Sequence, residues 1–133
     1  MSVQNATILA GPTISVTGGT SKAYTPSSQK VINGINIVDT TAADYRTRPN
    51  ISIRASEAQY DRNGVCVAKA IRKATATRPK ILASGSIEFP CIEVTLKIHP
   101  ETTDAEILAL IEMGVQLLTD ADFENFRKFG SIL

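Results

Sequence analysis

The sequence has few of the residues on which enzymes, metalloproteins and membrane proteins depend. Its 133 residues include no Trp, one His and two Cys. Cys66 and Cys91 are too few for a disulfide framework or for a four-ligand zinc site. No apolar run approaches the roughly 20 residues of a membrane-spanning helix, and the first residues do not form a secretory signal. We therefore expect no metal, no cofactor and no membrane association.

Candidate catalytic groups are equally sparse. His99 stands at a predicted strand end, where a surface or capping role accounts for it. Asp120 and Asp122 suit a helix start, and Glu106 and Glu112 suit a solvated helix surface. The sequence contains neither a Walker-type phosphate loop nor an HExxH zinc motif. We predict that the protein is not an enzyme.

Length and charge indicate one domain with a basic body and an acidic end. A chain of 133 residues is long enough to bury a core of its own. Residues 1–99 contain 12 Lys or Arg and 6 Asp or Glu, whereas residues 100–133 contain 2 and 7. The basic part suits a polyanionic partner, although both charge sets also fit ordinary solvated surfaces.

Alternating and β-branched segments predict strands over most of residues 1–98. Residues 1–17 are expected to hold a hairpin around Gly11-Pro12, and residues 18–30 a loop. The predicted sheet covers residues 31–98. Its strands are expected at residues 31–38, 48–56, 65–73 and 89–98, with turns at Asn33-Gly34 and residues 61–64 and a polar connection over residues 75–86.

Residues 103–130 predict two helices. Thr103 and Glu106 match a capping box at the start of the first, and Gly130 fits the end of the second. The apolar stripe of the first helix is too wide for a helix that lies on one sheet, so we expect a partner subunit to cover it. The expected interface residues are Ile107, Leu110, Ile111, Gly114 and Leu118. Strands followed by helices predict a single α+β domain with an antiparallel sheet.

Strict alternation predicts that one sheet face is polar. Asn50, Ser52, Arg54 and Ser56 alternate with Ile51, Ile53 and Ala55, and Glu93, Thr95 and Lys97 alternate in the same way with apolar residues. Arginines beside small hydrogen-bonding side chains suit nucleic acid, although they also suit a merely solvated face. For residues 65–73 both parities are possible. We favour the one that places Arg72 on the polar face, because it sends Val65, Val67 and Ile71 to the core.

Three segments make the sequence resemble the coat proteins of single-stranded RNA bacteriophages (leviviruses). Residues 51–59, Ile-Ser-Ile-Arg-Ala-Ser-Glu-Ala-Gln, resemble the family's Ser-Val-Arg-x-Ser-x-Ala-Gln strand and turn. Residues 93–98 followed by 103–107 resemble its last strand and first helix, and Asn33-Gly34-Ile35 resembles the opening of its first sheet strand. The order of elements agrees over most of the chain.

This resemblance implies an intertwined homodimer with one continuous sheet, across which each subunit lays its helices on its partner. It implies that dimers assemble into an icosahedral shell around single-stranded genomic RNA, in the cytoplasm of a bacterial host and then in the virion. In the family, the inner sheet face also binds an RNA hairpin that represses translation. The RNA-binding residues expected from this are Arg48, Asn50, Ser52, Arg54, Ser56, Phe89, Glu93 and Thr95, with Phe89 in the place of a base-stacking tyrosine. The parity that we favour for residues 65–73 adds Arg72.

Two other classes of protein remain open. A small dimeric RNA- or DNA-binding regulator would use the same sheet face without forming a shell. An enzyme or ligand-binding α+β domain would need a convergent polar site, which the sequence does not reveal.

Overall fold

The computed structural model describes residues 24–28 and 31–131, which belong to two compact units. One unit holds the sheet and spans Gly19–Pro100, and the other includes the helical residues from Glu101 onward. The hairpin predicted within residues 1–17 lies outside the described residues. The single domain that the sequence predicts stays a prediction.

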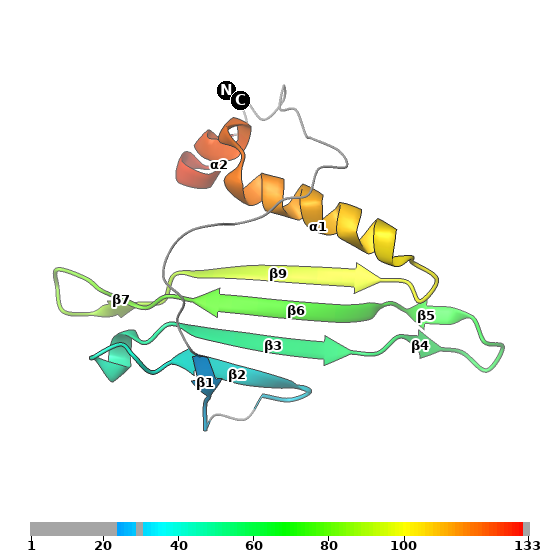
Figure 1. Ribbon diagram of the computed structural model, residues 1–133, viewed down its shortest axis with the longest axis horizontal. Helices are drawn as coiled ribbons and strands as arrows, with labels where there is room; N and C mark the ends of the chain where they lie inside the picture. The colour runs from blue at the N-terminus through cyan, green and yellow to red at the C-terminus, as the bar shows by residue number, and fades with distance from the viewer. Residues whose placement is uncertain (1–23, 29–30, 132–133) are drawn as a thin grey trace. The chain divides into compact units, whose positions relative to one another are not determined.

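Five antiparallel strands lie side by side in the main sheet (Figure 1). Their order across the sheet is β1 (Tyr24–Pro26), β2 (Gly34–Asp39), β3 (Asn50–Ser56), β6 (Ala70–Thr77) and β9 (Cys91–Ile98). A short 3-10 helix, η2 (Tyr45–Thr47), precedes β3. Asp44 caps it by accepting hydrogen bonds from the Arg46 backbone and side chain, which lower the pKa of this carboxyl. With the two C-terminal helices, the architecture is the predicted α+β class.

Two small hairpins extend the main sheet at opposite ends. β4 (Gln59–Tyr60) pairs with β5 (Cys66–Ala68), and β7 (Lys80–Ile81) pairs with β8 (Ile87–Glu88) (Figure 1). The Asp61 carboxylate accepts hydrogen bonds from the backbone N–H groups of Asn63 and Val65, and Gly64 has φ 78°. The turn predicted at residues 61–64 is therefore confirmed.

Several predicted boundaries are wrong. The loop expected at residues 18–30 contains β1, which pairs with β2. The local sequence of β1 is not strongly typical of a strand. The strand expected at 65–73 is divided between β5 and β6, and β6 continues to Thr77. The connection expected at 75–86 therefore holds the end of β6, then β7 and the turn that leads to β8. The end of β6 is hard to predict from residue propensities, because it contains Ala74 and Ala76 and alanine is a weak strand former.

The turn at Asn33-Gly34 positions β2 against β3. Asn33 adopts the left-handed conformation with φ 56°, which asparagine tolerates better than most residues. Gly34 lies so close to β3 that an added Cβ would be 1.9 Å from the carbonyl oxygen of Ile53. A side chain at this position would push the two strands apart, so glycine is required for the pairing.

The helices begin and end close to their predicted residues. α1 (Asp104–Thr119) carries the complete capping box of Thr103 and Glu106. The 3-10 turn η3 (Ala121–Phe123) leads into α2 (Glu124–Phe129), after which Gly130 adopts φ 67° as predicted. Within the described ranges, no helix is long and apolar enough to cross a membrane.

The described residues bury very little apolar surface. Their only buried hydrophobic side chains are Ala70 and Phe123. Many large apolar side chains of both units remain exposed, which is unusual because a folded domain gains most of its stability from their burial. Apolar surface of this extent is typical of an interaction site.

Candidate nucleic-acid interface

One face of the main sheet gathers nearly all of its polar side chains, and we call it the polar face. Cross-strand partners share a face, so the register of the strands assigns each residue to a face. Ser52 of β3 pairs with Thr75 of β6, which pairs with Glu93 of β9. Arg54 pairs in the same way with Lys73, which pairs with Thr95. The polar residues of this face are Asn36, Asn50, Ser52, Arg54, Ser56, Lys73, Thr75, Thr77, Cys91, Glu93, Thr95 and Lys97.

The centre of the polar face is hollowed around two cations. Ser52, Arg54, Lys73, Thr75 and Glu93 line a depression of about 230 Å³. Lys73 Nζ lies 3.4 Å from Glu93 Oε1 in an exposed ion pair, and such pairs are weak enough to exchange partners. Two cations beside hydroxyl groups provide charge and hydrogen-bond donors for a phosphate and its sugar.

A second, more apolar depression adjoins the first. It is lined by Ile32, Asn33, Arg54 and Lys73 among others, so it shares the same two cations. Ile32 is 84% exposed, and its side chain lines this depression together with Arg54 and Lys73. This neighbourhood suits a polyanion that carries flat apolar groups, as a single-stranded nucleic acid does.

The predicted residues Asn50, Ser52, Arg54, Ser56, Glu93 and Thr95 do lie together on the polar face. Arg48 and Phe89 lie outside the strands. Arg48 is half-buried at the end of η2, and its Nε is buried without a hydrogen-bond partner among the described residues. Phe89 precedes Pro90 and is 62% exposed, as a side chain that stacks on a base must be.

The predicted orientation of Arg72 is wrong. Arg72 pairs with Ala55 and with Leu96, so it lies on the face opposite Arg54. Its Nη1 donates to the carbonyl oxygen of Ser56, and its Nη2 lies 3.7 Å from Glu57 Oε1. The apolar side chains of 65–71 suggested the other parity, but Val65 and Val67 are on the β4–β5 hairpin and remain exposed.

Sequence reasoning missed Lys73 and Thr75, the residues that complete the central depression. The signal was present, because Lys73, Thr75 and Thr77 alternate with Ala74 and Ala76. A strand extended to Thr77 would have shown this polar parity, whereas a strand that ends at Lys73 does not.

The opposite face of the sheet is apolar, and we call it the apolar face. It includes Ile35, Ile37, Ile51, Ile53, Ala74, Ala76, Ile92, Val94 and Leu96. Ile53, Ile92 and Val94 are 43%, 42% and 47% exposed. Side chains of this kind on adjacent strands form a contiguous patch, which is typical of a protein–protein contact.

The two edges of the sheet differ in length and protection. β1 has three residues and contains Pro26, which cannot donate a hydrogen bond. β9 has eight residues, contains no proline and has no partner strand on its outer side in the described part of the chain. Natural sheets rarely leave such an edge unprotected, because it readily pairs with another strand.

Solved structures place this chain among known proteins. It is similar to the virus-like particle of bacteriophage GQ-907, with 31% sequence identity and a TM-score of 0.90 over 99% of this chain and 100% of that one. The chain belongs to this family of bacteriophage coat proteins. The virus-like particle of bacteriophage AVE019 shares the fold, with 13% identity and a TM-score of 0.63 over 86% of this chain and 89% of that one. No family model matches the sequence, and no curated protein matches it significantly.

The coat-protein family agrees with the predicted class of function. The predicted membership of a bacteriophage coat-protein family is confirmed. Coat proteins are structural proteins, so the prediction that the chain is not an enzyme is confirmed as well. Membership of a family that forms virus-like particles also gives a reason for the unburied apolar surface, since each subunit of a particle is covered in part by others.

Helix α1 of the coat protein is apolar on nearly every side. The predicted interface residues Leu110, Ile111 and Leu118 are 49%, 43% and 45% exposed, and Ile107 is half-buried. A Cβ added to Gly114 would meet nothing within 4 Å. No described residue of this chain therefore lies close against α1 at Gly114.

Proposed function

We propose that this coat protein forms a homodimer through β9, and that the dimers build an icosahedral shell. Antiparallel pairing of β9 with its copy makes one continuous ten-stranded sheet, because each subunit contributes the five strands of its main sheet. The unprotected edge of β9 supports this contact. The exposed apolar side chains of α1 support a second one, in which the helices of each subunit cover the apolar face of the other.

The polar face binds the single-stranded RNA genome in this proposal. Arg54 and Lys73 neutralise phosphates, and Ser52 and Thr75 bond to sugars or base edges. Phe89 stacks on an unpaired base at the rim. The same face is suited to an RNA hairpin whose binding represses translation. The observation that carries the proposal is the separation of a cationic polar face from an apolar face on one sheet, in a chain of a particle-forming family.

The shell assembles in the cytoplasm of the bacterial host, where the genomic RNA is made, and ends in the virion. The chain expressed alone in bacteria tests this directly. We expect size-exclusion chromatography with light scattering to show a particle in the megadalton range whose absorbance at 260 nm reveals nucleic acid. A particle free of RNA would contradict genome binding, and a dimer that never assembles would favour the small RNA- or DNA-binding regulator.

A further inference from the structure

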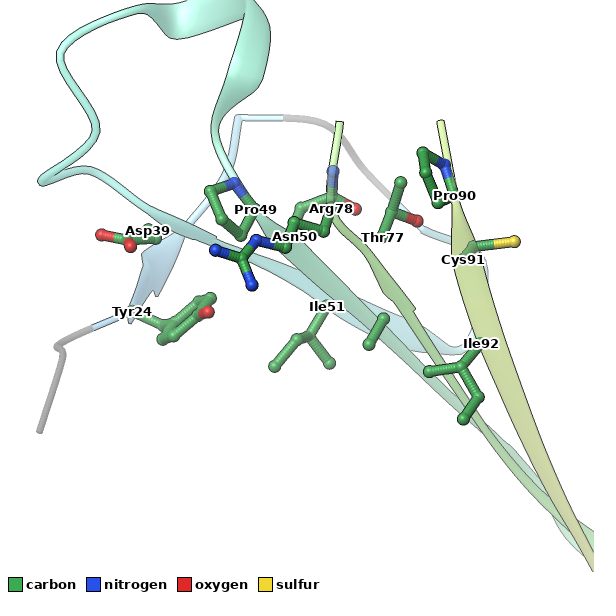
Figure 2. A pocket seen from close by; sticks show the side chains of 11 residues that line it. Tyr24, Asp39, Pro49, Asn50, Ile51, Thr77, Arg78, Pro90, Cys91 and Ile92 are labelled. Atoms are coloured by element: carbon green, nitrogen blue, oxygen red, sulfur yellow. The ribbon is translucent and has the colours of Figure 1, made fainter. Parts of the chain in front are cut away.

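The apolar face is hollowed at the end where β3 and β9 begin. This hollow has a volume of about 580 Å³. Figure 2 shows the side chains that line it. Tyr24, Ile51, Ala76, Arg78, Pro90 and Ile92 line it. Asp39, Asn50 and Thr77 add polar groups to this lining, and the Arg78 side chain extends toward Tyr24 (Figure 2). The hollow therefore combines a volume for apolar side chains with one positive charge.

No described residue of the same chain is a partner for the charge of Arg78. Its backbone N–H bonds to the carbonyl oxygen of Pro90, but its guanidinium makes no hydrogen bond or ion pair with the described residues. Asp39, which also lines the hollow, is 1% exposed and its carboxylate accepts two hydrogen bonds from Thr41. A buried arginine needs an acidic partner, so whatever covers the hollow should supply one.

Helix α1 carries a matching stripe on one side of its first two turns. Asp104, Ile107, Leu108 and Ile111 follow the i, i+3, i+4, i+7 spacing of one helix surface. Leu108 and Ile111 are 56% and 43% exposed. The side chain of Asp104 forms no ion pair among the described residues. It takes no part in the capping box, which consists of Thr103 and Glu106. The stripe thus presents one unpaired negative charge next to apolar side chains.

The two surfaces also belong to parts of opposite charge. Residues 19–100 carry 12 basic and 6 acidic residues, and residues 101–133 carry 2 and 7. This difference favours contact between the sheet of one copy and the helices of another, and it disfavours packing of two sheets face to face.

We propose that the hollow receives the first two turns of α1 from a second copy of the chain, with Asp104 of that copy paired to Arg78. Leu108 and Ile111 of the second copy fill the apolar part of the hollow. The pair fixes the register of the helix along the sheet, because an unpaired Arg78 under an apolar helix would cost stability. This inference rests on the proposed homodimer and names the contact that orients it.

Two single variants test the Arg78–Asp104 pair, each expressed alone, both co-expressed as separate chains, and both changes combined in one chain. Arg78→Glu places two acids together, and Asp104→Arg places two cations together. We expect each alone to lower the yield of soluble assembled protein by about tenfold or more. Co-expression of the two variant chains restores both contacts in a heterodimer, which holds one native pair and one reversed pair. Native mass spectrometry should then find heterodimers well above the roughly half expected from random pairing.

Matched controls separate this contact from general charge effects. Arg62→Glu makes the same charge change on the β4–β5 turn, and we expect it to leave the dimer intact. Glu112→Arg makes a reversal elsewhere on α1, and we expect no recovery when it is co-expressed with Arg78→Glu. Recovery of assembly in the mixture of Arg78→Glu and Glu112→Arg would overturn the proposal. So would a recovery of assembly that occurs when Arg78→Glu and Asp104→Arg are in one chain but not when they are in two co-expressed chains.

The test also distinguishes failure of this contact from failure of the dimer. If Arg78→Glu and Asp104→Arg both assemble as the unchanged chain does, the Arg78–Asp104 contact is wrong while the dimer stands. If the unchanged chain is monomeric in solution, the dimer itself is wrong.

Discussion

The two faces of one sheet make opposite demands on their surroundings. The polar face carries Arg54, Lys73 and several hydroxyl groups, which are groups that water can solvate. The apolar face carries isoleucine and valine side chains whose exposure to water is unfavourable. The apolar face therefore requires a protein partner for stability, whereas the polar face is free to take a ligand.

This difference has a simple origin in strand geometry. Successive side chains point to opposite faces, so neighbours such as Val94 and Thr95 on β9 have different surroundings although they share a backbone. Substitutions at adjacent positions can thus separate assembly from RNA binding.

The largest effect is expected from a charge on the apolar face. Val94→Asp should abolish the soluble dimer, because a carboxylate without a partner would lie in a desolvated contact at a cost of several kcal/mol. Sedimentation velocity of the purified variant measures this loss. Thr95→Asp is the matched control on the polar face, and we expect it to remain dimeric. If both variants dimerised normally, the apolar face would not be an interface.

Leu118→Asp extends the same comparison to the helices. Leu118 is 45% exposed within the chain, so the substitution would cost little in an isolated subunit. In a dimer whose helices cover the partner, we expect it to prevent soluble dimer formation. A folded dimer of normal size, judged by circular dichroism and light scattering, would show that this side of α1 is not in the interface.

A smaller effect is expected from cations of the polar face. Arg54→Ala should weaken binding of a single-stranded RNA by about tenfold, which corresponds to one charge-assisted hydrogen bond of roughly 1.5 kcal/mol. Its dimer should stay intact. Arg72→Ala removes an equal charge from the opposite face, so its RNA affinity should change much less. Fluorescence anisotropy on both variants measures the difference, and equal losses would show that the two faces do not differ toward RNA.

The salt dependence of RNA binding sharpens this result. For single strands, each neutralised phosphate contributes a slope of about −0.7 to a plot of log affinity against log salt. Arg54→Ala and Lys73→Ala should each reduce the slope by about that amount. An unchanged slope with reduced affinity would mean that Arg54 supports the sheet rather than contacting phosphate.

The sequence predicted the parts of this comparison that depend on strict alternation. Asn50, Ser52 and Arg54 were assigned to the correct face because β3 alternates without interruption and has isoleucine between its polar residues. The capping box of α1 was equally clear, since Thr103 and Glu106 act locally.

The errors occurred where pairing with distant residues decides the structure. Arg72 was assigned to the wrong face because Val65 and Val67 belong to a separate hairpin, which no local pattern indicates. β1 was missed because three residues carry too little signal and acquire their strand structure from β2. The hollow around Arg78 unites residues from β1, β3, β6 and β9, so only the assembled sheet reveals it.

The smallest effect is expected at an ion pair that belongs to neither face. Lys128 of α2 donates a hydrogen bond to Glu124, and this lowers the pKa of the Glu124 carboxyl below its ordinary value of 4.5. The pair's contribution to stability is then present above the unfolded-state pKa and is lost as the pH falls through the lowered folded-state pKa. Glu124→Gln should therefore slightly reduce stability at neutral pH and reduce its decline in acid, as urea denaturation followed by circular dichroism would measure. Its dimer and its RNA affinity should match those of the unchanged chain, because the pair is exposed and lies outside the sheet. A large loss of dimer in this variant would mean that the interface includes α2 in addition to β9, the apolar face and α1.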